Sequence, residues 1–358
     1  MRKDGNQGGR NDVASRKHLT AQMLAGSKAT DALDVVGRLL AVQAQDPRGA
    51  RLAVRARSLG LEAADIDREL TDQRSLLITW LNRGTLHLVR SEDYGWLQAL
   101  IAPSLVTGNT RRLAQEGVSP NLAERGVRTI RDSLAKDGPL TRQELRQHLD
   151  SAGVPTQGQA LVHVLMLASI RGHIVRGPMR GREQAYVLVG DWLAAQAPMR
   201  RELALGELAR RYLVGHGPAN DRDLAQWAGL PLRDARAGIR EVGSALTERS
   251  NGLLELRPVP RAAPIPPPTL LGPYEPLLLG WESREPVLGT AKGLITVNGL
   301  FRPFALVNGR AAATWNLAGG RISIEPLRTL SRSEQAALQA ESRDVYRFLG
   351  LSEPSGSH

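Results

Sequence analysis

The sequence predicts an α+β protein made of tandem winged-helix units, each a helix-turn-helix with a β-hairpin wing, followed by a small antiparallel β unit and a C-terminal helix. Two observations predict this class. The order helix, helix, helix, hairpin occurs three times at spacings of several tens of residues, which is typical of a tandem array. Towards the C-terminus the apolar period becomes two, with Asn-Gly between apolar runs, which indicates hairpins.

The first unit begins with residues 16–45, where apolar side chains at helical spacing predict two amphipathic helices. Pro47 should end the second of these helices, because the residue before a proline disfavours the α conformation. A Gly-containing turn at Leu81-Asn82-Arg83-Gly84 then separates two β-rich runs and predicts the first hairpin. The remaining helices and strands of this unit are predicted at 50–59, 63–70, 76–80 and 85–89.

The second and third units repeat this order. Thr141 and Glu144 form a predicted capping box, with Glu three residues after Thr. The helices of these units are predicted at 121–136, 141–149, 156–170, 203–214, 220–227 and 232–242. The hairpin strands are predicted at 173–176, 184–189, 246–248 and 253–256.

The C-terminal part opens with the proline-rich stretch 258–268, which is typical of a linker. Asn298-Gly299 and Asn308-Gly309 separate β runs, and a helix over 331–348 closes the chain. The β runs are predicted at 293–297, 301–307 and 311–315. The predicted domains are a flexible arm, three winged helices and the C-terminal part, at 1–15, 16–118, 119–195, 196–258 and 259–358.

The amino-acid composition limits the classes of function and partner that are possible. Among 358 residues, 47 Lys plus Arg against 36 Asp plus Glu give a formal charge of +11, which favours a polyanionic partner. Aromatic residues are only 4%, which disfavours a stacking platform for single strands, so double-stranded DNA is the better match. The absence of cysteine excludes disulfides, thiolate metal sites and a cysteine nucleophile. With no membrane-length apolar run and no apolar secretory signal, we expect a cytoplasmic protein without a membrane partner. We also expect the protein to act as a monomer.

Motifs for phosphate, dinucleotide, ester and zinc chemistry are missing: no GxxxxGK[ST], GxGxxG, GxSxG or HExxH occurs. The seven histidines lie far apart in the sequence and show no ligand spacing, so we expect neither a metal nor a cofactor.

The unusual local feature is Gln43-Ala44-Gln45-Asp46-Pro47, which gathers two glutamines and an aspartate at the end of an apolar helix. Residues i and i+2 do not share a face of a regular helix, so Gln43 and Gln45 can converge only if the last turn loosens. From the residues alone, a polar helix C-terminus without a catalytic role is the alternative interpretation.

Arginines near the hairpins are predicted to bind DNA. Arg176, Arg180 and Arg182 surround the tip of the second hairpin, where a positive wing contacts phosphates without reading the base sequence. Arg83, in the turn of the first hairpin, is predicted to bind DNA as well.

Several stretches together resemble one bacterial family. They read VQAQDP at 42–47, RGTLHLV at 83–89, RRYL at 210–213, HGPA at 216–219, DLAQWAGL at 223–230, PLLLGW at 276–281 and ATW at 313–315. From about residue 16 to residue 349, the chain resembles the winged-helix DNA-binding family that includes the AlkZ-type DNA glycosylases.

The resemblance implies tandem winged helices around a concave duplex-binding face. It also implies excision of N-alkylated purines, including bulky adducts and interstrand crosslinks. The family's signature is Gln-apolar-Gln or Gln-apolar-Asp, and Gln43-Ala44-Gln45 matches the first form. Its C-terminal β-hairpin is thought to approach DNA, which makes Arg302 the candidate contact here. Tyr274-Glu275 stands where relatives carry Phe-Asp, and the sequence leaves the role of that acidic position open.

The signature suits a cationic substrate. An N7-alkylated guanine leaves as a neutral base without a protonating acid, so the site must stabilise charge on the sugar and position water. A glutamine oxygen does both weakly. We expect Gln45 to hold the water and Gln43 to orient the sugar or Gln45, while Asp46 is either a base or a turn residue. No lysine accompanies the motif, so we predict a monofunctional glycosylase without lyase activity.

Two other functions stay open at this point, because winged helices serve several roles and fold alone does not decide. One is a non-catalytic DNA-binding protein such as a transcriptional regulator, and the other is a structural chromatin-associated protein. A regulator should prefer a defined operator, whereas a repair enzyme, for instance one for self-resistance to a genotoxic metabolite, should turn over damaged DNA.

Overall fold

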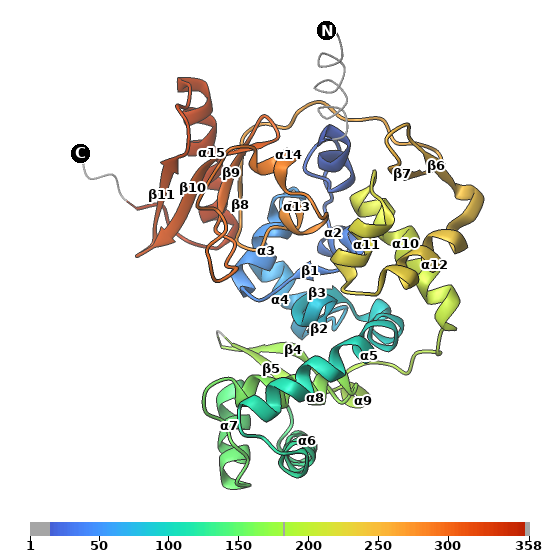
Figure 1. Ribbon diagram of the computed structural model, residues 1–358. Coiled ribbons are helices and arrows are strands. Elements are labelled where there is room, and N and C mark those ends of the chain that lie inside the picture. The colour runs from blue at the N-terminus through green and yellow to red at the C-terminus, as the bar shows by residue number, and fades with distance from the viewer. Residues whose placement is uncertain (1–14, 182, 355–358) are drawn as a thin grey trace. The chain divides into compact units, whose positions relative to one another are not determined.

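The computed structural model of the chain describes residues 15–181 and 183–354 (Figure 1). The predicted flexible arm lies outside these residues except for Ser15, and Arg182 lies outside them as well. Helices combine with antiparallel sheets, which confirms the predicted α+β class. Two compact units form: unit 1 comprises Met1–Ile66, Leu205–Trp227 and Leu232–His358, and unit 2 comprises Asp67–Ala204 and Ala228–Pro231.

Unit 1 is built from both ends of the chain. Its helices are α2 (Ala32–Leu39), α3 (Pro47–Arg55), most of α10 (Arg201–His216), α11 (Asp221–Ala228), α12 (Leu232–Val242), α13 (Pro276–Leu279), α14 (Glu285–Leu288) and α15 (Arg332–Phe348). Its strands are β1 (Val42–Gln43), β6 (Leu246–Glu248), β7 (Leu254–Leu256), β8 (Thr269–Leu271), β9 (Phe304–Val307), β10 (Arg310–Ala318) and β11 (Arg321–Pro326). Helix α4 (Ala63–Thr71) leads from unit 1 into unit 2.

The C-terminal part of unit 1 is an antiparallel sheet in the order β11-β10-β9-β8, with α15 packed against β8 (Figure 1). Asn308-Gly309 turns between β9 and β10, and both residues have positive φ (+53° and +77°), as this hairpin signal requires. The strand predicted at 293–297 is wrong: that segment forms a single bridge between Ile295 and Phe301. Strands β8 and β11 were not predicted.

Helix α2 ends earlier than the sequence predicts. Leu40 adopts a left-handed conformation (φ +64°), and Val42–Gln43 continues as an extended segment. Pro47 does not end a helix but occupies the first turn of α3, where a missing N–H leaves no hydrogen bond unmade. The prediction failed because a proline is compatible with the start of a helix as well as with its end.

Unit 2 contains one antiparallel sheet covered by helices. Within the unit its strands run in the order β3-β2-β4-β5. Helices α5 and α8 pack on each other and on β2, and α6 packs on α7, α8 and β5. The elements are β2 (Leu76–Leu81), the 3₁₀ turn η1 (Asn82–Gly84), β3 (Thr85–Arg90), α5 (Ser91–Gln115), α6 (Pro120–Asp137), α7 (Arg142–Ser151), α8 (Ala160–Ile170), β4 (Ile174–Arg180), β5 (Glu183–Leu188) and α9 (Val189–Trp192).

An aromatic cluster forms part of the core of unit 1. The rings of Tyr212 and His216 stack with centroids 4.7 Å apart, and Trp227 packs against both. The Tyr212 hydroxyl donates to the Gly280 carbonyl oxygen at 2.7 Å, and Trp281 Nε1 donates to the His216 carbonyl oxygen at 2.9 Å. These residues belong to the stretches that carry the resemblance, and their structural role is to hold α10 and α11 to the segment around α13.

Candidate active site

The two glutamines of the motif meet side by side. Gln43 Nε2 donates a hydrogen bond to Gln45 Oε1 across 2.6 Å. Gln43 is 6% exposed, whereas Gln45 is open to solvent. They converge because α2 has already ended, and side chains at i and i+2 of an extended segment point to the same side. The carbonyl oxygen of Gln45 keeps a second lone pair with which it can accept a hydrogen bond from water.

Asp46 begins the next helix. Its Oδ1 accepts a hydrogen bond from the Gly49 backbone N–H at 2.7 Å, which caps α3. The side chain is half-buried, directly after the exposed Gln45. Asp46 therefore has a structural hydrogen bond in the free protein, and it fixes the point at which the glutamine segment joins α3.

A loop from the distant part of unit 1 crosses the start of α3. A Cβ at Gly49 would lie 2.6 Å from the Pro273 carbonyl oxygen, so only glycine allows this approach. Tyr274 follows in a left-handed conformation (φ +55°), and burial together with the nearby Asp46 carboxylate raises its pKa. No sequence pattern indicates that Tyr274 lies near the motif, because 228 positions separate it from Asp46.

Glu275, whose role the sequence left open, forms a fully buried ion pair. Its Oε1 accepts from Arg57 Nη2 at 2.5 Å, and both side chains are 0% exposed. The same Arg57 nitrogen donates to Gln22 Oε1 at 2.8 Å. Arg57 lies just beyond the C-terminus of α3, so the acidic position anchors the helix that follows the glutamines.

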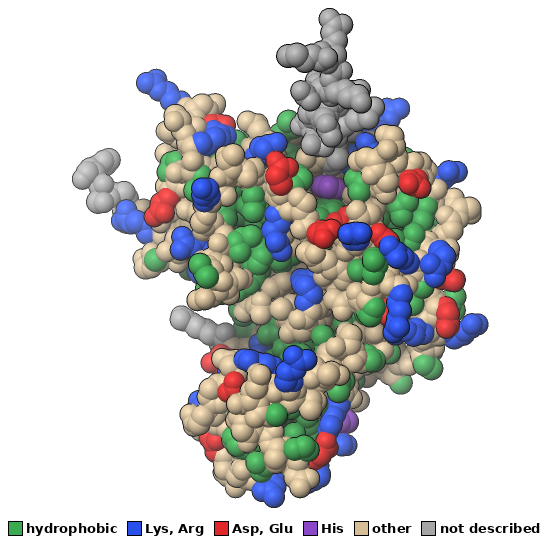
Figure 2. Space-filling view, viewed as in Figure 1, with side chains coloured by type: hydrophobic (Ala, Val, Ile, Leu, Met, Phe, Trp, Pro, Cys, Tyr) green, Lys and Arg blue, Asp and Glu red, His purple; other side chains and the backbone are tan. Residues whose placement is uncertain are grey.

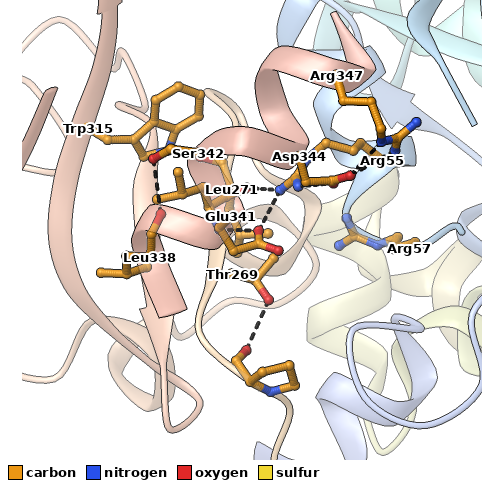
Figure 3. Close-up of polar contacts among 12 residues, drawn as sticks. Arg55, Arg57, Thr269, Leu271, Trp315, Leu338, Glu341, Ser342, Asp344 and Arg347 are labelled. Atoms are coloured by element: carbon orange, nitrogen blue, oxygen red, sulfur yellow. Dashed lines mark hydrogen bonds and ion pairs between the residues drawn. The ribbon is translucent and has the colours of Figure 1, made fainter. Parts of the chain in front are cut away.

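A second arginine fixes α3 to the end of the chain. Figure 3 shows Arg55 directed at the carboxylates of α15. It donates to Glu341 at 2.9 Å and to Asp344 at 2.7 Å, and also to the Leu270 carbonyl oxygen at 2.6 Å. Together the two arginines hold α3 on β8, α15 and the Glu275 segment, which gives the glutamine motif a rigid support.

The loop that carries Arg302 connects to the same region of unit 1. Arg302 is exposed, and its backbone N–H donates to the Leu294 carbonyl oxygen. The centroid of the neighbouring Phe301 ring lies 6.0 Å from that of the Tyr274 ring. The guanidinium of Arg284 lies over the Phe301 ring, 5.4 Å from its centroid. Unit 1 thus brings the loop of Arg302 to Tyr274, which in turn adjoins Asp46.

The hairpin arginines of unit 2 are held by neighbours. Arg176 lies over the rings of Trp80 and Tyr186, 5.4 and 4.9 Å from their centroids, and donates to the Tyr186 hydroxyl. Arg180 pairs with Glu144 at 2.8 Å. Arg176 and Arg180 are therefore each engaged by neighbours within unit 2. Arg83 lines a groove of unit 2, with a left-handed backbone (φ +59°).

The surface in view carries much positive charge. Figure 2 shows Lys and Arg side chains gathered over α11 and α12. Part of this charge is compensated, because Arg236 pairs with Asp221 at 2.7 Å. In the described part of the chain, no group of three or more His, Cys, Asp or Glu residues is placed to hold a metal ion. No helix there is long and apolar enough to cross a membrane.

The comparisons with known proteins identify the family of this chain. The sequence profile described as DNA glycosylase AlkZ-like matches residues 36–348. The chain belongs to this family of DNA glycosylases. Among curated proteins it is similar to the interstrand DNA cross-link repair glycosylase of Streptomyces sahachiroi, with 28% identity over 92% of this chain and 94% of that protein. Among solved structures it is similar to the Streptomyces sahachiroi DNA glycosylase AlkZ, with 26% identity, a TM-score of 0.78, and coverage of 96% of this chain and 97% of that one.

Proposed function

We propose that this protein is a monofunctional DNA glycosylase that excises N-alkylated purines from double-stranded DNA, including purines joined in interstrand crosslinks. The observation that carries the proposal is the hydrogen-bonded pair of Gln43 and Gln45. Family membership supplies the reaction class, and the S. sahachiroi relative is named for cross-link repair.

The geometry supports different roles for the two glutamines. Gln43 is buried and uses its amide N–H to hold the Gln45 oxygen, while Gln45 faces solvent, from which a water molecule can reach it. A water held by Gln45 Oε1 is oriented for attack on the sugar, and the amide dipoles stabilise the positive charge that develops there. A glutamine does not accept a proton at neutral pH, so the reaction needs a base that already leaves without acid catalysis. A cationic N7-alkylated purine meets that requirement.

The DNA-binding assignments belong to the same proposal. We infer that tandem winged helices place the duplex, with bounds at 16–118, 119–195 and 196–258, and with the C-terminal β unit from 259 onwards. Arg83, Arg176, Arg180, Arg182 and Arg302 are the inferred DNA contacts. Arg302 has the clearest support, because it is exposed on a loop linked through Phe301 to Tyr274. Acting on chromosomal DNA, the protein would work in the cytoplasm.

The test is a strand-cleavage assay on a duplex with a single N7-methylguanine. The protein is added in excess, and hot alkali then cleaves any abasic site. We expect cleavage after alkali, none without it, and loss of cleavage in Gln45→Ala. The control Gln143→Ala removes an exposed glutamine of α7 and should keep full activity. Full excision by Gln45→Ala would overturn the site assignment, and duplex binding without any excision of methylated or crosslinked DNA would indicate a non-catalytic DNA-binding protein.

A further inference from the structure

A groove in unit 2, which we call the α5 groove, carries positive charge that the glutamine site does not use. It lies between the turn of β2 and β3, helix α5 and helix α8, and has a volume of about 490 Å³. Arg83, Arg111, Arg112 and His163 line it. No acidic side chain and no Phe, Trp or Tyr lines it in the described part of the chain. Such a lining attracts anions and offers no surface on which a base could stack.

Two arginines of the α5 groove, Arg111 and Arg112, keep most of their charge available. Arg111 is exposed and pairs with no carboxylate in the described part of the chain. Arg112 donates to Gln115, and the nearest carboxylate, that of Glu116, is 4.0 Å away. Glu116 is itself engaged by the backbone N–H of Gln159 at 2.9 Å. The positive charge of α5 is therefore largely uncompensated at this place.

A buried amide orients the histidine of the groove. Asn109, 2% exposed, donates from Nδ2 to the His163 carbonyl oxygen at 3.1 Å, and its Oδ1 lies 2.8 Å from His163 Nδ1. Since Asn109 Oδ1 is an acceptor, His163 carries its proton on Nδ1 and donates it there. Burial and the nearby Arg112 lower the pKa of His163, so Nε2 carries no proton in the free protein and the positive charge of the groove comes from its arginines.

Gly108 leaves open space in the α5 groove beside the backbone of α5. It lies inside α5, a position where glycine weakens a helix. A Cβ added there would meet no described atom within 4 Å, so no packing contact within the protein requires glycine. A glycine that lines an open groove instead lets a ligand approach the helix backbone closely.

We propose that the α5 groove binds the sugar-phosphate backbone of duplex DNA, with Arg111 and Arg112 as phosphate contacts beside Arg83. The inference rests on the proposed function only in taking DNA as the partner. The uncompensated arginines favour a polyanion, and the missing stacking surface favours backbone over bases. The turn that carries Arg83 is closely packed, because a Cβ at Gly229 would lie 2.7 Å from the Arg83 backbone nitrogen.

The test measures binding of an undamaged 20-bp duplex by fluorescence anisotropy at several salt concentrations. The double variant Arg111→Ala/Arg112→Ala should bind at least tenfold more weakly and lower the slope of log K against log salt by about 2, since each lost phosphate contact removes about 0.9. The control is Arg128→Ala, an exposed arginine of α6 outside the groove, and losses are compared per arginine removed. Equal affinity and slope for the double variant and the wild type would overturn the proposal, as would an equal loss per arginine in Arg128→Ala.

Gly108 provides a second arm of the test. Gly108→Glu places a carboxylate in the groove and should weaken duplex binding at least tenfold. The unfolding midpoint of Gly108→Glu should not fall below that of the wild type, because glutamate is a better helix former than glycine and a Cβ fits there, and this separates binding loss from misfolding. Unchanged affinity in Gly108→Glu would contradict the proposal. Excision of N7-methylguanine by excess wild-type protein is measured in parallel, so failure of the glycosylase reaction is seen independently of failure of the groove to bind.

Discussion

Arg57 and Glu275 form an ion pair of 2.5 Å in which neither side chain is reached by solvent. Removing one partner leaves a buried charge without compensation, which costs about 3–5 kcal/mol. We therefore expect Glu275→Gln to lower the free energy of unfolding in urea by that amount. The double variant Arg57→Met/Glu275→Leu removes both charges and should be more stable than Glu275→Gln. A Glu275→Gln protein as stable as the wild type would show that the pair does not anchor α3.

The hydrogen bond between Gln43 and Gln45 predicts a graded loss of activity. Gln45→Ala removes the group that we propose to hold the water and should reduce single-turnover excision by roughly 10²–10³-fold, the usual effect of losing one preorganised polar group. Gln43→Ala leaves Gln45 in place without its support and should cost about tenfold, the equivalent of about 1.4 kcal/mol. Duplex affinity should stay within twofold in both variants. A larger loss in Gln43→Ala than in Gln45→Ala would reverse the assigned roles.

Asp46 caps α3. An isosteric substitution distinguishes this capping role from a role as the general base of the reaction. Asparagine caps a helix as well as aspartate does, so Asp46→Asn should keep both excision and stability. Asp46→Ala loses the hydrogen bond to the Gly49 N–H and should destabilise the protein by about 1 kcal/mol. Circular dichroism during urea unfolding measures the stability, and the alkali assay measures excision. If Asp46→Asn folds normally but no longer excises, Asp46 is the base.

Stability should fall in mild acid because of His18. Burial lowers the pKa of this histidine to about 4, against 6.5 in an unfolded chain, and its Nε2 lies 2.8 Å from the Pro218 carbonyl oxygen. Because the folded pKa is the lower one, the unfolded state takes up the proton first. The contribution of neutral His18 to the free energy of unfolding is therefore fully present above pH 6.5 and is lost as the pH falls towards 4. At pH 5 this loss is about 2 kcal/mol. Between pH 7 and pH 5 the urea unfolding midpoint should decrease less in His18→Gln than in the wild type. An equal decrease in both proteins would refute this origin.

Local signals predicted the elements that depend on them. The capping box of α7 is confirmed in both directions between Thr141 and Glu144, and α12 has the predicted bounds 232–242. The three hairpins predicted with the winged-helix units all form, since each has a turn residue between apolar runs. Helix α5 was missed because Pro103 and two glycines interrupt its pattern, and its packing on α8 and β2 stabilises it instead.

The candidate site was predictable in its residue types but not in its supports. Gln-apolar-Gln identified Gln43 and Gln45, yet their convergence depends on Leu40 ending α2 in a left-handed conformation, which no local rule predicts for leucine. Arg57 and Glu275 are partners across 218 positions, and neither lies in a pattern that signals pairing. Charge counts likewise could not separate the open arginines of α5 from Arg180, which is neutralised by Glu144.

The bonds from Arg55 to α15 also have a consequence for how the enzyme is made. The partners Asp344 and Glu341 follow Arg55 by 289 and 286 residues. A ribosome adding about 5–20 residues per second reaches them roughly 15–60 s after Arg55 is synthesised. Most of unit 2 is continuous, from residue 67 to 204, and can fold during that interval. The glutamine segment receives this support only after residue 344 has been synthesised, so a nascent chain can complete most of unit 2 before it completes the glutamine site.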